Sequence, residues 1–303
     1  MNLNPSLTGL FNGDFRFVGN YKNQWSSIPA PFKTFSASAD MKLIKIKNDQ
    51  VGLGIVINND KAGDSDFKTF QANVSISYLK PLSTNQGIGI GLQTGITNKS
   101  FNISKLTFDS QYNGTNYDPS LGSGETSSNT SFSYFDLSTG VTWFYKYNER
   151  TKFNIGTSYF HINKPKQSFF SNASVLLDPK FSINSSCQIK INTVIDLIPT
   201  LLFETQGEFR ETIGGGSLKY LLLPQMGNET AVYLGGFYRG RDAFILSVAM
   251  DYNKFYLGIS YDINNSPLKI ASNNRGGVEM SLVYIVQKFI PVKHNKIPCP
   301  VFL

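Results

Sequence analysis

Cysteine and histidine are nearly absent from this sequence of 303 residues, which contains two of each. Cys187 and Cys299 are too few for a disulfide scaffold, which has more cysteines in a shorter chain. Together with His161 and His294 they do not form the set of about four spaced ligands that a structural zinc ion requires. We therefore expect two free or loosely paired thiols, with no metal site and no cofactor.

Charge is also scarce, at 16% of residues, where soluble proteins average about 25%. No run approaches the roughly 18 consecutive apolar residues of a membrane-spanning helix. The mean hydropathy is only −0.17, although 14% of the residues are aromatic, so the apolar residues are dispersed among polar ones. The formal charge of +7 comes from lysines and arginines scattered along the chain, which argues against nucleic acid as a partner.

What the sequence has instead is alternation. In the stretch Asn85–Ser100, aliphatic residues from Ile88 to Ile96 occupy alternate positions, and most positions between them are glycine. This period of two predicts a β-strand with one aliphatic face and one face almost without side chains. The same alternation recurs along most of the chain, weakens between residues 181 and 222, and predicts about fourteen strands of about nine to twelve residues each.

Strands of this length match β-strands tilted across a bilayer, where only a closed barrel leaves no unpaired edge. Short connections such as "YNER" follow most even-numbered strands, and long ones such as Lys99–Thr130 follow most odd-numbered strands. We therefore predict an all-β fold, a transmembrane antiparallel β-barrel of about fourteen strands of the outer-membrane type. A soluble β-sandwich or propeller fits less well, because its solvent face would carry more lysine and glutamate than glycine and serine.

The predicted barrel is a single domain covering residues 1–303. The aliphatic face of Gly87–Thr97 is expected to touch lipid. The glycine face is expected to look inward, where it either leaves room for something in the lumen or lets the strands bend. Short turns of such barrels face the periplasm, so both termini are expected there, with 1–12 as a periplasmic or lumenal segment and 291–303 as a periplasmic tail. The first residues lack the features of a signal peptide, so we expect any export signal to have been removed or to fall outside this numbering.

Several segments resemble the PorP/SprF family. Asn4-Pro5 matches the family's Asn-Pro opening, and Lys22, Gln24 and Trp25 match the end of its first strand. The next similar segments are Pro31–Asp40 and the Gly-rich strand with its turn at Asn59–Gly63. The most specific similarity lies in residues 257–285, which include Tyr261-Asp262-Ile263-Asn264 and Gly276-Gly277, and Cys299-Pro300 is similar as well.

The resemblance implies an integral outer-membrane component of the type IX secretion system of Bacteroidota, which supports export or surface attachment of particular large proteins such as gliding adhesins. The implied partners are outer-membrane lipid, other secretion components such as periplasmic ring or lipoprotein subunits, and the exported adhesin or its C-terminal domain. The residues alone also allow a porin or transporter for small or hydrophobic solutes. An open lumen would favour that alternative, and a lumen filled by the N-terminus or by loops would favour the interaction role.

No catalytic set is apparent, and we expect a protein that is not an enzyme. The alternation places His161 with Tyr159, at the lipid edge. The Gly-rich segment Ile213–Ser217 lacks the Lys-Ser/Thr of a phosphate-binding loop. The carboxylates of the segment 59–66 do not have the spacing of a calcium loop, so a solvated loop is expected there.

Six residues are candidates for contact with partner proteins. Trp25, at the end of the first strand, fits an interfacial anchor better than a binding hot spot. Asp262 fits an Asx-turn that caps its loop better than a partner contact. Few charges face inward in the first two strands, mainly Arg16, Lys22 and Asp40. The complete candidate set is Trp25, Tyr261, Asp262, Arg275, Lys293 and Phe302.

Overall fold

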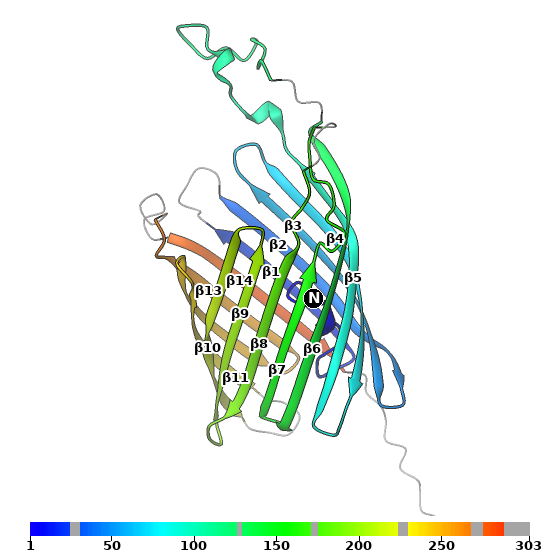
Figure 1. Ribbon diagram of the computed structural model, residues 1–303. Helices are drawn as coiled ribbons and strands as arrows, with labels where there is room; N and C mark the ends of the chain where they lie inside the picture. The colour runs from blue at the N-terminus through cyan, green and yellow to red at the C-terminus, as the bar shows by residue number, and fades with distance from the viewer. Residues whose placement is uncertain (25–30, 126–128, 171–174, 224–229, 268–274, 288–303) are drawn as a thin grey trace, which may run out of the picture.

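Fourteen antiparallel strands form a closed barrel (Figure 1). The computed structural model describes residues 1–24, 31–125, 129–170, 175–223, 230–267 and 275–287. Strands that are consecutive in sequence pair with one another, and β1 also pairs with β14, so the described sheet has no free edge. The predicted fourteen-stranded antiparallel barrel is confirmed.

The strand boundaries differ in length around the barrel. The strands are β1 (Phe15–Gln24), β2 (Phe32–Ile46), β3 (Asp49–Ala62), β4 (Phe67–Pro81), β5 (Gln86–Ser100), β6 (Ser131–Asn148), β7 (Thr151–Phe160), β8 (Lys180–Lys190), β9 (Ile195–Gln206), β10 (Phe209–Leu223), β11 (Thr230–Arg239), β12 (Ala243–Tyr252), β13 (Phe255–Asn264) and β14 (Arg275–Val286). The described helical segments are three short 3-10 turns, η1 (Pro5–Leu7), η2 (Ile103–Lys105) and η3 (Asp109–Gln111). No helix among the described residues is long and apolar enough to cross a membrane.

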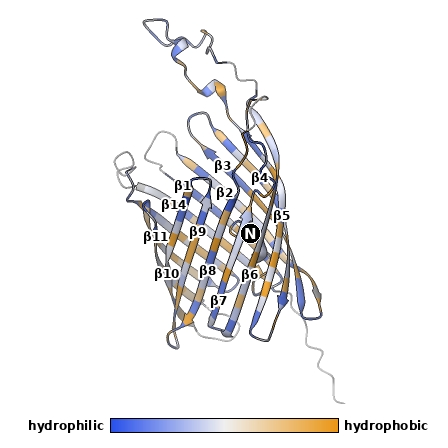
Figure 2. Cartoon of the chain, viewed as in Figure 1, coloured by the Kyte–Doolittle hydropathy of each residue, from blue (hydrophilic) through white to orange (hydrophobic). Residues whose placement is uncertain are grey.

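The two faces of the wall are chemically different, as the alternation predicts. In β5 the outward side chains of Ile90 and Leu92 are 51% and 53% exposed, whereas Gly91 and Gln93 are buried on the inward face. Figure 2 shows the same alternation of apolar and polar residues along the other strands. An outward aliphatic band around a closed sheet is the surface that hydrocarbon requires.

The closing pair joins the two ends of the chain without a slip in register. It runs from Phe15 opposite Val286 to Gln24 opposite Gly277. Irregularities lie in other pairs, for example where β13 meets β14 between Tyr261 and Ile263. The pairing of the first and last strands is therefore free of the register shifts that occur in some other pairs of the wall.

The strands differ from the sequence-based expectation in three respects. Six strands, β2 to β6 and β10, have 14 to 18 residues rather than about nine to twelve. Within the stretch where the alternation weakens, β9 and β10 form a tight hairpin, in which Gly207 adopts φ +56°, a conformation that favours glycine. The turn expected at Asn59–Gly63 begins later, since β3 continues to Ala62.

Loop lengths also follow the expected alternation with exceptions. The long connections 101–130 and 161–179 follow β5 and β7, and short turns follow β2, β6 and β12. The connections after β9 and β11 are short although these strands are odd-numbered. The end with the long loops is called the outer end below, and the opposite end, with most short turns, is called the periplasmic end.

The assignment of faces predicts a difference between two arginine substitutions. Leu92→Arg places a charge in the middle of the outward face of β5 and is expected to lower the free energy of unfolding by about 2–4 kcal/mol. Gln71→Arg is the control, because Gln71 faces the lumen and contacts Asn58, where a charge stays hydrated. Urea unfolding in lipid vesicles measures both. Equal losses for the two variants would contradict the assignment of faces.

Candidate functional site

The N-terminal residues Met1–Leu10 lie inside the barrel and are called the N-terminal plug (Figure 1). The plug turns at η1, where Asn4 accepts a hydrogen bond from the Ser6 amide at 3.0 Å and Pro5 occupies the first helical position. Asparagine at the cap and proline directly after it both favour this turn. The side chains of Asn4, Ser6 and Thr8 are completely buried.

Polar contacts join the plug to seven strands. The side-chain nitrogen of Asn4 (Nδ2) lies 3.2 Å from the Val141 carbonyl oxygen and 3.1 Å from the Thr157 carbonyl oxygen. The Thr8 hydroxyl lies 2.7 Å from the Ser75 hydroxyl. The other contacts are Asn2 with Ser36 and Asn58, Leu3 with Ser158, Asn4 with Asn184, Leu7 with Arg16, Thr8 with Ser77, and Gly9 with Asp40 and Gln50.

Glycines of the inward face make this approach possible. A Cβ at Gly91 would lie 2.3 Å from the Pro5 carbonyl carbon, and a Cβ at Gly140 would lie 2.1 Å from the Asn4 side-chain oxygen. A Cβ at Gly52 would lie 2.5 Å from the Thr8 carbonyl oxygen. Real Cβ atoms do not come this close, so these three glycines leave the space that the plug occupies.

Arg16 connects the plug to the wall beneath it. Its guanidinium pairs with Asp40, with an Nη2–Oδ2 distance of 2.8 Å, and also donates to the Leu7 carbonyl. The other carboxylate contact of Asp40 is the Gly9 amide, at 2.8 Å. A buried carboxylate needs such partners, so two of the three inward charges expected in the first two strands, Arg16 and Asp40, support the plug.

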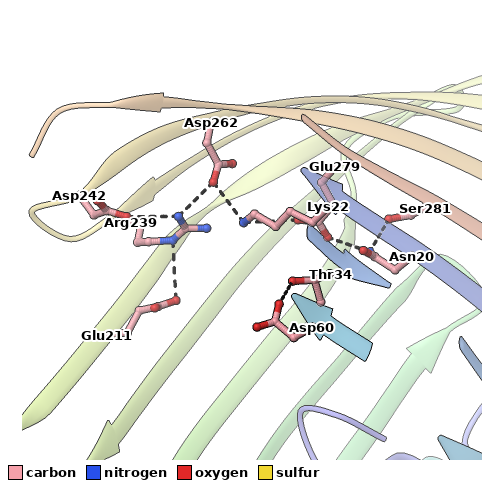
Figure 3. A network of polar contacts seen from close by, with 10 residues as sticks. All are labelled: Asn20, Lys22, Thr34, Asp60, Glu211, Arg239, Asp242, Asp262, Glu279 and Ser281. Carbon is pink, nitrogen blue, oxygen red and sulfur yellow. Dashed lines mark hydrogen bonds and ion pairs between the residues drawn. The ribbon is translucent and has the colours of Figure 1, made fainter. Parts of the chain in front are cut away.

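A second group of inward charges lies near the outer end and is called the mouth network: Lys22, Glu211, Arg239, Asp242, Asp262 and Glu279 (Figure 3). Asp262 is its centre, 1% exposed, and accepts from Lys22 Nζ at 3.2 Å and from Arg239 Nη1 at 3.0 Å. Lys22 also lies 3.7 Å from Glu279. These pairs link β11 and β13 with β14 and β1, across the closing seam.

The loop after β5 forms an outer arm, residues 101–125, that projects beyond the barrel rim (Figure 1). Its base is fixed by Lys105, which together with Lys61 binds Asp66 and holds the pKa of that carboxyl down at about 2. Phe169 of the following long loop packs edge-on against Phe101, at 4.8 Å between ring centroids. The arm is therefore attached to two neighbouring connections.

The distal part of the arm is ordered by its own side chains. Gln111 is 9% exposed, accepts from the Phe108 amide and donates to the Leu121 carbonyl. Next to it, Tyr112 and Tyr117 form an isolated antiparallel bridge, and their side chains are 59% and 48% exposed. The arm thus presents two adjacent tyrosines on a backbone that is already hydrogen-bonded.

The six sequence-predicted candidate residues are not brought together. Trp25, Lys293 and Phe302 lie outside the described residues, and for Arg275 only the backbone is described, opposite Ile263. Tyr261 is 39% exposed on β13. The carboxylate of Asp262, for which an Asx-turn was expected, is paired with Lys22 and Arg239.

His161 also differs from expectation. It lies just beyond the end of β7, adopts φ +60°, and its Nδ1 lies 2.9 Å from both carboxylate oxygens of Asp136. The strand ends one residue earlier, so the alternation with Tyr159 does not extend to it. No group of three or more potential metal ligands occurs within the described parts of the chain.

The chain is similar to one protein family in sequence and to several outer-membrane barrels in fold. A family model described as "Type IX secretion system membrane protein PorP/SprF" matches residues 1–284. No curated protein matches the sequence. Among solved structures, the monoaromatic hydrocarbon channel CymD is similar, with a TM-score of 0.54 and 9% identity over 95% of this chain and 92% of that chain. The Pseudomonas putida toluene transporter TodX has a TM-score of 0.52 and 8% identity over 92% and 90%. Identity this low shows a shared fold alone.

The glycine contacts predict that a side chain at Gly91 expels the plug. Gly91→Val is expected to make the barrel conduct ions in a planar bilayer and to expose the first residues to protease, because the new side chain takes the space of Pro5 and Ser6. Gly19→Val is the matched control, since nothing lies within 4 Å of a Cβ at Gly19. A Gly91→Val protein that stays closed and protease-resistant would contradict the plug's dependence on this contact.

The mouth network predicts a stability loss at Asp262. Asp262→Asn removes the shared carboxylate of Lys22 and Arg239, and we expect the free energy of unfolding to fall by about 3 kcal/mol. Asp64→Asn, in an exposed turn, is expected to change it by less than about 0.5 kcal/mol. Urea titrations measure the free energy of unfolding of both variants. Equal unfolding midpoints for the two variants would show that the mouth network does not stabilise the barrel.

Proposed function

Because this chain belongs to the PorP/SprF family of type IX secretion system membrane proteins and is an integral outer-membrane β-barrel, we propose that it is a non-enzymatic component of that system. In this role it supports the export or surface attachment of particular large proteins, such as gliding adhesins. Its partners are other secretion components, including periplasmic ring or lipoprotein subunits, and the exported protein or its C-terminal domain.

The observation that carries the proposal is the filled lumen. Met1–Leu10 occupies part of the interior through buried polar contacts, and we infer that it narrows the path for solutes. A passive porin keeps a water-filled channel. When its own chain occupies the interior of a barrel, the two ends remain as surfaces for partner proteins. This favours a role in binding partner proteins over one in solute transport.

The outer arm supplies a surface suited to an exported polypeptide. Exposed tyrosines give large contact areas at low cost in conformational entropy, and an ordered backbone reduces the entropy lost on binding. Beyond Lys105 the described arm carries Asp109, Asp118 and Glu125 and no lysine or arginine. Tyr112 and Tyr117 with these carboxylates therefore favour a partner surface that combines apolar and basic groups.

The sequence candidates are divided between the two ends in this proposal. Tyr261 and Arg275, at the outer end, and Trp25, which follows β1 in the sequence, are proposed contacts for the exported protein. Lys293 and Phe302 belong to the tail and are proposed contacts for components below the membrane. Asp262 acts through the mouth network, which fixes the strands that carry the outer contacts.

An enzymatic role lacks support in the part of the chain that is described. His161 and Asp136 form a pair, and no hydrogen bond joins that ring to a described serine or cysteine. The transporter alternative has the hydrocarbon channels as fold relatives, but a fold shared at 8–9% identity does not carry a substrate with it.

The test is a clean deletion complemented by arm variants. The deletion is expected to abolish surface display of one or a few large proteins while solute uptake stays normal. Complementation with Tyr112→Ala/Tyr117→Ala is expected to restore barrel levels without restoring display, because the two rings form the proposed contact. Tyr147→Ala, which removes an exposed ring at the periplasmic end of β6 (69% exposed), is the control and should restore both.

Normal display with a specific uptake defect in the deletion strain would favour the transporter. Restored display with the double tyrosine variant would leave the secretion role in place but remove the arm from it. The two results are read from surface proteomics and growth on single solutes in the same strains.

A further inference from the structure

The wall of the barrel has a step in height between β6 and β7. β6 (Ser131–Asn148) has 18 residues and β7 (Thr151–Phe160) has 10, and their pairing ends at Thr139 opposite Tyr159. Beyond Thr139, β6 continues past the end of β7 (Figure 1). A strand of about ten residues is enough to cross the hydrocarbon, so this part of β6 rises above the hydrocarbon at the outer end. It is paired with β5 on one side and no longer has β7 on the other.

The residues that follow β7 occupy only the lower part of this edge. His161 adopts φ +60° and turns the chain away from the line of β7. The Asn163 side chain then donates to the Phe135 carbonyl at 2.7 Å and accepts from the Leu137 amide at 3.1 Å. The Ile162 amide donates to the Leu137 carbonyl at 2.9 Å. A neighbouring strand would bind the same backbone groups of β6, so this edge already accepts a partner that imitates a strand.

The edge above Phe135 is open. The backbone groups of alternate residues point to the same side of an antiparallel strand. Because the Phe135 carbonyl points to the β7 side, the backbone groups of Ser131 and Ser133 point there as well. Among the described residues, no backbone hydrogen bond reaches either serine from this side, and the loop after β7 pairs with itself through a bridge between Lys166 and Leu176. Both serines are exposed, so their N–H and C=O groups can bind an added strand.

The side chains along this edge determine which residues an added strand should carry. Ser131 and Ser133 face outward, whereas Phe132 and Tyr134 face the interior and stack, with 6.1 Å between their ring centroids. Phe169 of the following loop packs edge-on against Phe132 at 4.7 Å, which holds that ring in place. An added strand would place alternate residues beside the two rings and beside the two serines. Cross-strand pairs of β-branched residues with aromatic rings, and of threonine with serine, stabilise neighbouring strands.

We propose that the outer edge of β6, Ser131–Phe135, binds an extended segment of another polypeptide by strand addition. The segment runs antiparallel to β6, in the line of β7, and exchanges backbone hydrogen bonds with Ser131 and Ser133. It carries β-branched apolar residues opposite Phe132 and Tyr134, and threonine or serine opposite the two serines. That the segment belongs to the exported protein rests on the proposed function; the binding itself does not.

A second copy of the chain fits this edge less well than a segment from outside the membrane. The added strand lies in the plane of the wall, directly above β7, whereas a second barrel in the same membrane lies beside the wall. Strands of such barrels tilt by about 35–45°, so two copies related by a two-fold axis along the membrane normal cross their facing strands at about twice that angle. Crossed strands cannot form a ladder. A segment of an exported polypeptide has no such constraint, and the outer arm proposed to contact it leads directly into β6.

The experiment uses the full chain in nanodiscs of phosphatidylcholine. The probe is a fluorescent peptide, Lys-Thr-Val-Thr-Val-Thr-Lys, and its counterpart has the same sequence with N-methyl groups on the threonines. Fluorescence anisotropy is expected to show saturable binding of the first peptide. The counterpart is expected to bind at least about tenfold more weakly, because its methylated amides donate no hydrogen bond. Hydrogen–deuterium exchange at the Ser133 and Phe135 amides is expected to slow when the first peptide is bound.

Ser133→Pro and Ser133→Ala are the matched pair of variants. Proline removes the N–H that points to the β7 side, which the pairing with β5 does not use, and proline is tolerated at the edge of a sheet. Ser133→Pro is expected to lower the affinity at least about tenfold, because a hydrogen bond is lost and the ring fills the space of the added strand. Ser133→Ala keeps the N–H, loses the hydroxyl contact with Asn98, and is expected to lower the affinity less than about threefold. Heat-dependent gel mobility checks that each variant has formed a barrel.

Equal affinity of the two peptides for the unchanged chain would overturn the proposal whether or not Ser133→Pro folds, and so would equal affinity of the two folded variants. A dimer of the chain in detergent that Ser133→Pro dissociates would also overturn it, because the edge would then bind a second copy. If no peptide binds while the deletion strain still loses surface proteins, the edge proposal fails and the secretion role stands. If the first peptide binds but surface display is normal in that strain, the edge site stands and the secretion role falls.

Discussion

The backbone of Pro5–Gly9 approaches the barrel wall so closely that the wall must lack side chains where they meet. Gly52 and Gly91 supply these gaps on β3 and β5, and Gly140 on β6 leaves room for the Asn4 side chain. In return, the plug supplies hydrogen-bonding groups to inward serines and threonines that would otherwise face an empty lumen. Because a β-strand alternates its faces strictly, the same strands can present continuous aliphatic surface to lipid on the other side.

The charged groups of the interior follow from this packing. A lumen narrowed by the plug leaves two regions where long polar side chains fit, one on each side of it. On the outer side the mouth network crosses the seam between β14 and β1, which has no connecting loop and depends on pairing alone. On the periplasmic side Arg16 connects wall and plug.

Much of the wall was predictable because one physical rule governs it. Strands such as β5 separate lipid from lumen along their length, so their sequence alternates and the strand count follows. The pattern weakens in β9 and β10, where apolar residues occur on both faces. Leu221 is 4% exposed and faces inward, whereas its neighbour Leu222 is 48% exposed. The hairpin at Gly207 was not predicted, because the weak alternation does not show where β9 ends and β10 begins.

The internal partnerships were not predictable, because they join residues far apart in the sequence. Asp262 meets Lys22 and Arg239 only after the barrel closes, and a local turn was the simplest explanation of an aspartate at a strand end. His161 was placed with the outward residues because the pattern does not show that β7 stops one residue before it. The Asn4-Pro5 motif was visible, but its position inside the barrel depends on glycines more than 80 residues away, such as Gly91.

The plug also determines how the two ends of the molecule relate. Asn2 reaches Ser36 and Asn58 in the outer half of the wall, whereas Leu10 and Phe11 line a cavity beside the turn between β6 and β7. A single short segment therefore contacts both halves of the wall, and hydrogen bonds to Arg16 and Asp40 hold it between them. The plug occupies space that a path for solutes would need. The occupied lumen therefore favours a role in binding partner proteins over one in solute transport.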